Sequence, residues 1–160
     1  MKNIMVQVSN KSWTMEALHL ACAMARDSDT TITLVRFMEV GHPSYLGTSM
    51  GNIAPTPQEY QELQDYQATA EDYGVELDVR SIQCLSPLDV VAQAADELEA
   101  DVVFARVPEH AIPYWRKFQI WNLERGLKSQ ARQLYTLDKP ANITEWVPSV
   151  TVNASVSNKS

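Results

Sequence analysis

The chain has 160 residues, the size of one domain, and a domain of this size buries a hydrophobic core without disulfides or metal ions. Its net charge of −7 argues against a protein that binds nucleic acid through the phosphate backbone, and two cysteines are too few for a disulfide framework. No apolar run approaches the roughly 20 residues that span a bilayer, and the N-terminus lacks the pattern of a signal peptide, so we expect a cytoplasmic protein.

The first elements alternate between strand and helix. An apolar run over Ile4–Val8 predicts a first strand. Small residues at helical spacing between Ala17 and Ala25 predict a helix that packs closely on a sheet, with Thr14 as its cap and Asp27–Asp29 as its end. Thr31–Val40 then predicts the second strand.

The middle of the chain continues this alternation. The segment Gly41–Pro57 holds three of the five glycines and predicts a loop. A helix is expected over Pro57–Tyr73, with Gly74 as its stop. Val75–Ile82 has the alternation of a third strand, and Ser86 is expected to cap the helix that follows.

The last part of the chain begins with a short apolar strand over Ala100–Ala105, as expected for a strand covered on both faces. Pro113–Tyr135 predicts a long aromatic and basic helix, and Asn142–Val147 a fifth strand. We therefore expect a single doubly wound α/β domain over residues 1–148, with a five-stranded parallel sheet flanked by helices. Residues 149–160 are expected to form a polar, flexible tail.

The order of these elements resembles the universal stress protein family over Lys2–Val147. The likeness is carried by the Ile4–Val8 strand, by Thr33–Val35 in the second strand, by Pro87 at the start of a helix, and by Glu99–Val103 before the fourth strand. This resemblance implies a doubly wound domain that usually forms dimers and serves in stress survival and regulation. It also implies ATP or AMP binding in one subset of members, and no defined catalytic activity in most.

The sequence departs from the pattern of the ATP-binding members. They end the first strand with aspartate, where this chain has Ser9, and they follow the fourth strand with a glycine-rich Gly-x2-Gly-x9-Gly-Ser/Thr segment. Here no glycine follows that strand before Gly126. Pro108 and Pro113 have no N–H to offer a phosphate, and Glu109 would repel one. We therefore expect no ATP binding in the family's usual mode.

Polar residues at the carboxyl ends of the strands are the candidates for a ligand pocket, because ligands of parallel sheets bind there. These candidates are Ser9, Asn10, Arg106, Glu109 and His110. The alternative is that they cap helix ends and satisfy loop backbone. No arrangement of serine, histidine or carboxylates predicts catalysis, and no histidine or cysteine spacing predicts a metal site.

The expected aromatic helix offers a candidate partner surface. Trp115, Phe118 and Trp121 recur at intervals of three, and Arg116 lies among them. Residues 106–139 carry seven basic and three acidic side chains, so this region is locally positive in an acidic chain. The alternative is a stripe that faces the core. Contact with an anionic membrane surface is disfavoured by the acidic remainder of the domain.

The sequence favours a non-catalytic domain of the universal stress protein type that acts in stress response or regulation through self-association and protein contacts. We expect a homodimer, and the candidate interface is the expected last strand, Ile143–Val147. The alternative function is a small-molecule or nucleotide sensor with a rewired pocket around Ser9 and Arg106. No cofactor, metal ion or catalytic residue is assigned.

Overall fold

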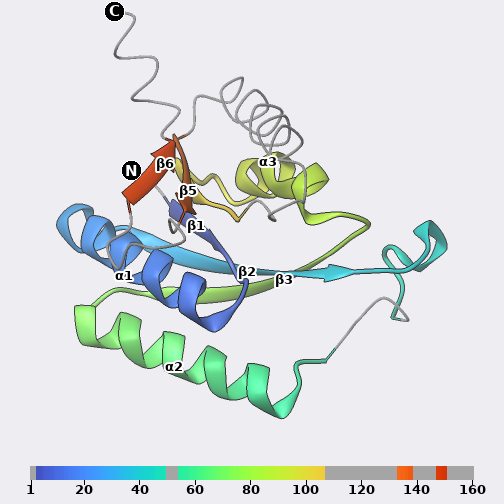
Figure 1. The fold of residues 1–160 in the computed structure, drawn as a ribbon, viewed down its shortest axis with the longest axis horizontal. Coiled ribbons are helices and arrows are strands. Elements are labelled where there is room, and N and C mark those ends of the chain that lie inside the picture. The colour runs from blue at the N-terminus through green and yellow to red at the C-terminus, as the bar shows by residue number, and fades with distance from the viewer. Residues whose placement is uncertain (1–2, 50–53, 107–132, 139–146, 151–160) are drawn as a thin grey trace, which may run out of the picture.

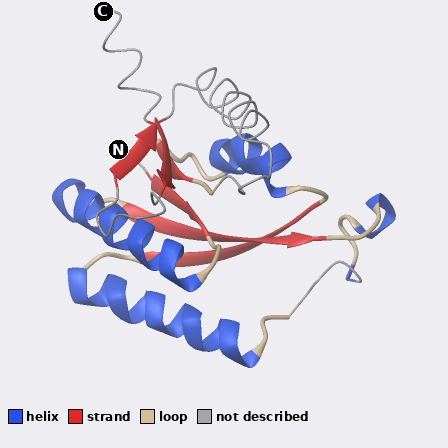
Figure 2. Cartoon of the chain, viewed as in Figure 1, coloured by secondary structure: helices blue, strands red, loops and turns tan. Residues whose placement is uncertain are grey.

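A computed structural model describes residues 3–49, 54–106, 133–138 and 147–150. They form a six-stranded sheet of order β3-β2-β1-β4-β5-β6, with helices on both faces (Figures 1 and 2). The strands are β1 (Asn3–Gln7), β2 (Thr31–Glu39), β3 (Leu77–Cys84), β4 (Val102–Phe104), β5 (Gln133–Asp138) and β6 (Val147–Val150). The first five are parallel and β6 is antiparallel to β5, so the expected five-stranded parallel sheet is confirmed.

Among the described residues, three α-helices and one short 3-10 helix lie between the strands. They are α1 (Lys11–Ser28), α2 (Pro57–Tyr73), α3 (Pro87–Glu97) and η1 (Pro43–Tyr45). Helices α1 and α2 share one core with residues of the sheet such as Ile4, and α3 shares the other with Met5. Neighbouring residues of β1 thus face opposite cores, which is why this strand is an unbroken apolar run. No helix among the described residues has both the length and the hydropathy of a membrane span.

The cap of α1 differs from the prediction. Asn10 is the N-cap, and its Oδ1 accepts a hydrogen bond from the N–H of Trp13 at 2.9 Å. Thr14 is buried inside the first turns of the helix, where its Oγ1 accepts from the N–H of Ser9 at 2.8 Å. Both residue types are good N-caps, and the extended backbone at Asn10 decides between them. The end of the helix at Asp29, in the left-handed region, agrees with the prediction.

The ends of α2 are set by local chemistry, as expected. The Thr56 side chain accepts from the N–H of Glu59 at 3.2 Å, and Pro57 occupies the first turn. At the other end Gly74 has φ 71°, a conformation that glycine adopts without strain, and its N–H donates to the last carbonyls of the helix. Ser86 is the N-cap residue of α3, but its side chain makes no capping hydrogen bond.

The described part of the expected loop after β2 is held against β3 by one side chain. The Gln83 Oε1 accepts from the N–H of Gly47 at 2.6 Å, and its Nε2 donates to the carbonyl of Thr48 at 2.9 Å. The loop therefore folds back to contact Gln83, a residue of the β2–β3 ladder.

The prediction that Asn142–Val147 forms the fifth parallel strand was wrong. The fifth parallel strand is β5, whose first residues, 133–135, were expected to end the long helix; the rest of that helix lies outside the described residues. Buried Leu134 and Thr136 alternate with half-buried Tyr135, which stacks on Phe104 at 5.0 Å between ring centroids. A single leucine between polar residues fits helical and strand spacing equally, and pairing with β4 decides the outcome.

The last strand also begins and ends later than expected. Of the segment Asn142–Val147 only Val147 is described, and there it begins β6, which continues through Pro148 to Val150. Proline is compatible with a strand at the edge of a sheet, because the missing N–H need not face a neighbour. Residues 149 and 150 thus belong to the sheet and not to the expected tail.

The opposite edge of the sheet is β3, and its open side is partly occupied. The N–H of Val40 donates to the carbonyl of Cys84 at 2.9 Å, so even-numbered residues of β3 form the ladder with β2. The N–H of Val79 therefore faces away from β2, where Asp78 Oδ1 accepts it at 3.0 Å. Asp78 Oδ2 also accepts from Nε of Arg80 at 2.7 Å. A charged pair thus protects this edge against strand addition.

Candidate functional site

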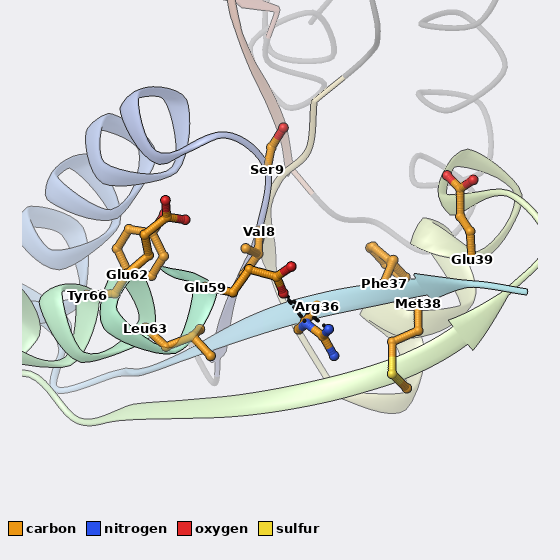
Figure 3. Close-up of a pocket in the computed structure, with 10 residues that line it drawn as sticks. All are labelled: Val8, Ser9, Arg36, Phe37, Met38, Glu39, Glu59, Glu62, Leu63 and Tyr66. Carbon is orange, nitrogen blue, oxygen red and sulfur yellow. Dashed lines mark hydrogen bonds and ion pairs between the residues drawn. The ribbon is translucent and has the colours of Figure 1, made fainter. Parts of the chain in front are cut away.

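A cavity of about 480 Å³ lies where the carboxyl ends of β1 and β2 meet α2 (Figure 3). This volume is in the range of small-molecule sites, and the position agrees with the rule for parallel sheets. The lining is half polar and half apolar in character, with Val8, Ser9, Arg36, Phe37, Met38, Glu39, Glu59, Glu62, Leu63 and Tyr66.

Arg36 is the basic residue of this lining. It projects from β2, and its side chain is 12% exposed. The Nε and Nη2 atoms both donate to Oε2 of Glu59, at 3.3 and 3.2 Å, and Figure 3 shows this pair. A guanidinium with so little solvent contact requires a charged acceptor, and Glu59 in the first turn of α2 supplies it. The pair therefore fixes the start of α2 over the end of β2.

Tyr66 is a fully buried aromatic residue of the lining. Burial raises the pKa of its hydroxyl, the hydroxyl of Thr14 opposes that shift, and the carboxylate of Glu62 adds to it. Among the described residues, no group completes a hydrogen bond of good geometry to the Tyr66 oxygen. A buried hydroxyl without a full partner costs free energy in the folded state, and the neighbouring hydroxyl of Thr14 reduces that cost.

Ser9, Asn10 and Arg106 come together as the sequence predicts. The Arg106 Nη1 donates to Oγ of Ser9 at 3.0 Å, and the Arg106 N–H donates to Oε1 of Gln7 at 2.9 Å. Ser9 lines the cavity, whereas Asn10 serves as the cap of α1, which is the alternative that we considered for it. Glu109 and His110 lie outside the described residues.

The two helices beside the cavity are joined at their surface. Lys11 Nζ of α1 lies 2.7 Å from Oδ2 of Asp65 in α2. The hydrogen bond from Lys11 lowers the pKa of Asp65, and the same bond raises the pKa of Lys11. The carboxylate of Glu62, in the cavity lining, raises the pKa of Lys11 further. The α1–α2 contact is thus sensitive to charge.

The histidines, cysteines and carboxylates form no metal site among the described residues, and the candidate partner surface is not described. No group of three or more histidine, cysteine, aspartate or glutamate side chains there could hold a metal ion. Cys22 is buried, and burial raises the pKa of its thiol to about 11, so it packs as a small apolar side chain. The candidate partner residues Trp115, Arg116, Phe118 and Trp121 lie outside the described residues and remain a prediction.

Sequence reasoning missed the residues that β2 and α2 supply to the cavity. Arg36 is a charged residue between the apolar pairs Leu34–Val35 and Phe37–Met38 of β2, which was a usable signal. Glu59, Glu62 and Tyr66 follow helical spacing and looked like an ordinary helix surface. Gln7, a polar residue in the apolar run of β1, was a signal for a different contact, since its Oε1 accepts from the N–H of Arg106.

Solved structures share this fold. One is a universal stress protein in complex with cAMP, with a TM-score of 0.58 and 14% identity, covering 84% of this chain and 94% of that one. A universal stress protein family member from Burkholderia pseudomallei has a TM-score of 0.56 and 18% identity over 84% of this chain and 93% of that one. A family protein from Arabidopsis thaliana with AMP bound has a TM-score of 0.52 and 14% identity, covering 91% and 96%.

No protein with a curated description matches the sequence. Identities below 20% show a common fold and do not transfer a ligand. The sequence itself carries a stronger result, since the model of the universal stress protein family matches residues 1–106, from β1 through β4. The chain belongs to the universal stress protein family.

Proposed function

We propose that this universal stress protein domain is a non-catalytic regulator that binds a small organic molecule in the cavity between β1, β2 and α2. The observation that carries the proposal is the cavity itself, which combines suitable volume, an apolar wall and the Arg36–Glu59 pair at the carboxyl edge of the sheet. The link to stress response comes from the family, whose members serve in that role.

Structures of the family that hold cAMP and AMP make a nucleotide the first ligand to test. We propose that ATP is not held in the family's usual mode. The lining places three carboxylates against one guanidinium, and Glu59 already occupies that guanidinium. At the neighbouring strand end Ser9 accepts from Arg106, and no glycine follows until Gly126. Such surroundings oppose a triphosphate.

Native mass spectrometry of the full chain tests this proposal, first as purified from cytosol and then with AMP, cAMP, adenosine and ATP–Mg²⁺. The expected result is a one-to-one adduct with a small molecule, and no adduct that depends on the γ-phosphate. Leu63→Trp, which fills the cavity, is expected to remove the adduct. Leu20→Trp, on the exposed side of α1, is the matched control and retains it.

Leu63 packs partly against the core, so Leu63→Phe provides a milder filling variant if the tryptophan impairs folding. Absence of every adduct from the wild-type chain would overturn the proposal. An adduct that both filling variants retain would also overturn it, because the ligand would then bind elsewhere.

Self-association is the second candidate function, and the two edges of the sheet favour one geometry for it. The outer edge of β5 pairs with β6 of the same chain, with Thr136 opposite Val150 and Asp138 opposite Val147. The β3 edge carries the Asp78 carboxylate on the outward N–H of Val79. We therefore expect a homodimer to form through β6, which begins at the last residue of the expected interface Ile143–Val147. Residues 143–146 of that interface lie outside the described residues.

Cysteine cross-linking with analytical ultracentrifugation tests this interface. Two antiparallel copies of β6 around a twofold axis would bring the two copies of residue 149 close together. Ser149→Cys is then expected to form a disulfide-linked dimer, and Ser81→Cys, exposed on β3, is not. The native cysteines are both buried and do not compete. A monomer in sedimentation, or cross-linking at residue 81 alone, would contradict a dimer interface at β6.

A further inference from the structure

We draw no further inference here: the strongest candidate, the surface patch of exposed apolar side chains where the loop after β2 meets the end of β3 (Tyr45, Leu46 and Leu85), carries nothing, because nothing in the described part of the chain shows what covers it.

Discussion

Arg36 donates from two nitrogen atoms to a single carboxylate oxygen of Glu59, and this contact joins the end of β2 to the first turn of α2. Arg36 is nearly buried whereas Glu59 is half exposed, so the two residues are unequal partners. Glu59→Gln is expected to lower the free energy of unfolding by about 1–2 kcal/mol, because the guanidinium loses its charged acceptor. Arg36→Met is expected to cost less, since an apolar side chain of similar length needs no acceptor.

Urea denaturation of the two single variants and the double variant measures these differences. The double variant is expected to be no less stable than Glu59→Gln, because the buried charge is then absent. Greater destabilisation by Arg36→Met than by Glu59→Gln would contradict the unequal pair.

Tyr66→Phe is expected to leave the free energy of unfolding unchanged within about 0.5 kcal/mol, or to raise it. Removal of a buried hydroxyl usually costs stability because its partner is left unsatisfied, but this hydroxyl has no completed hydrogen bond among the described residues. Tyr73→Phe is a control, because the Tyr73 hydroxyl lies 3.0 Å from Nδ1 of His19. A loss above about 1 kcal/mol for Tyr66→Phe would show that its oxygen is hydrogen-bonded.

The Lys11–Asp65 ion pair predicts an acid-dependent contribution to stability. The folded-state pKa of Asp65 lies below its unfolded value of about 3.9, so the contribution is complete above that value. It is lost as the pH falls from there through the folded-state pKa. The pKa of Lys11 is raised, so a second loss occurs as the pH rises above its ordinary value and through the folded-state value.

Carboxyl-detected NMR titration of Asp65 measures the first shift directly. Lys11→Met is expected to move the midpoint of the Asp65 titration upward, since Lys11 supplies the largest cause of the depression. An Asp65 midpoint that does not respond to Lys11→Met would mean that the pair does not persist in solution.

The buried thiols predict slow chemical modification. Burial raises the pKa of Cys22 to about 11, and both cysteines lie in the interior. The native protein is expected to react with iodoacetamide at pH 8 much more slowly than the unfolded chain, because little thiolate is present or accessible. Peptide mass spectrometry measures labelling at each cysteine over time. Rapid labelling of Cys22 in the native state would show that α1 opens readily.

The sequence predicted the elements that are defined by local chemistry. The apolar run of β1, the left-handed stop at Gly74 and the strand before Cys84 are each encoded within a few residues. The fifth strand was missed because Leu134 fits two periodicities, and only its alignment with Val103 in β4 distinguishes them.

Some residues of the candidate site could likewise be predicted from the sequence, and others could not. Ser9 and Arg106 were predictable because both follow strands that end at one edge of the sheet. The pairing of Arg36 with Glu59 depends on how α2 lies over β2, and no local pattern encodes that placement. The same is true of Tyr66, whose hydroxyl is unusual only because of what surrounds it in the folded chain.

The carboxylate of Asp78 on the outward N–H of Val79 has a consequence for the protein at high concentration. A sheet grows when an edge strand recruits backbone from another chain, and here one outward N–H of the edge strand is already occupied by the carboxylate of the preceding residue. For a member of a family that serves cells under stress, such an edge would limit coaggregation with partly unfolded proteins. Asp78→Ala would free that N–H for pairing with another chain. The variant is therefore expected to aggregate more at high concentration and on storage, with little change in folding or ligand binding.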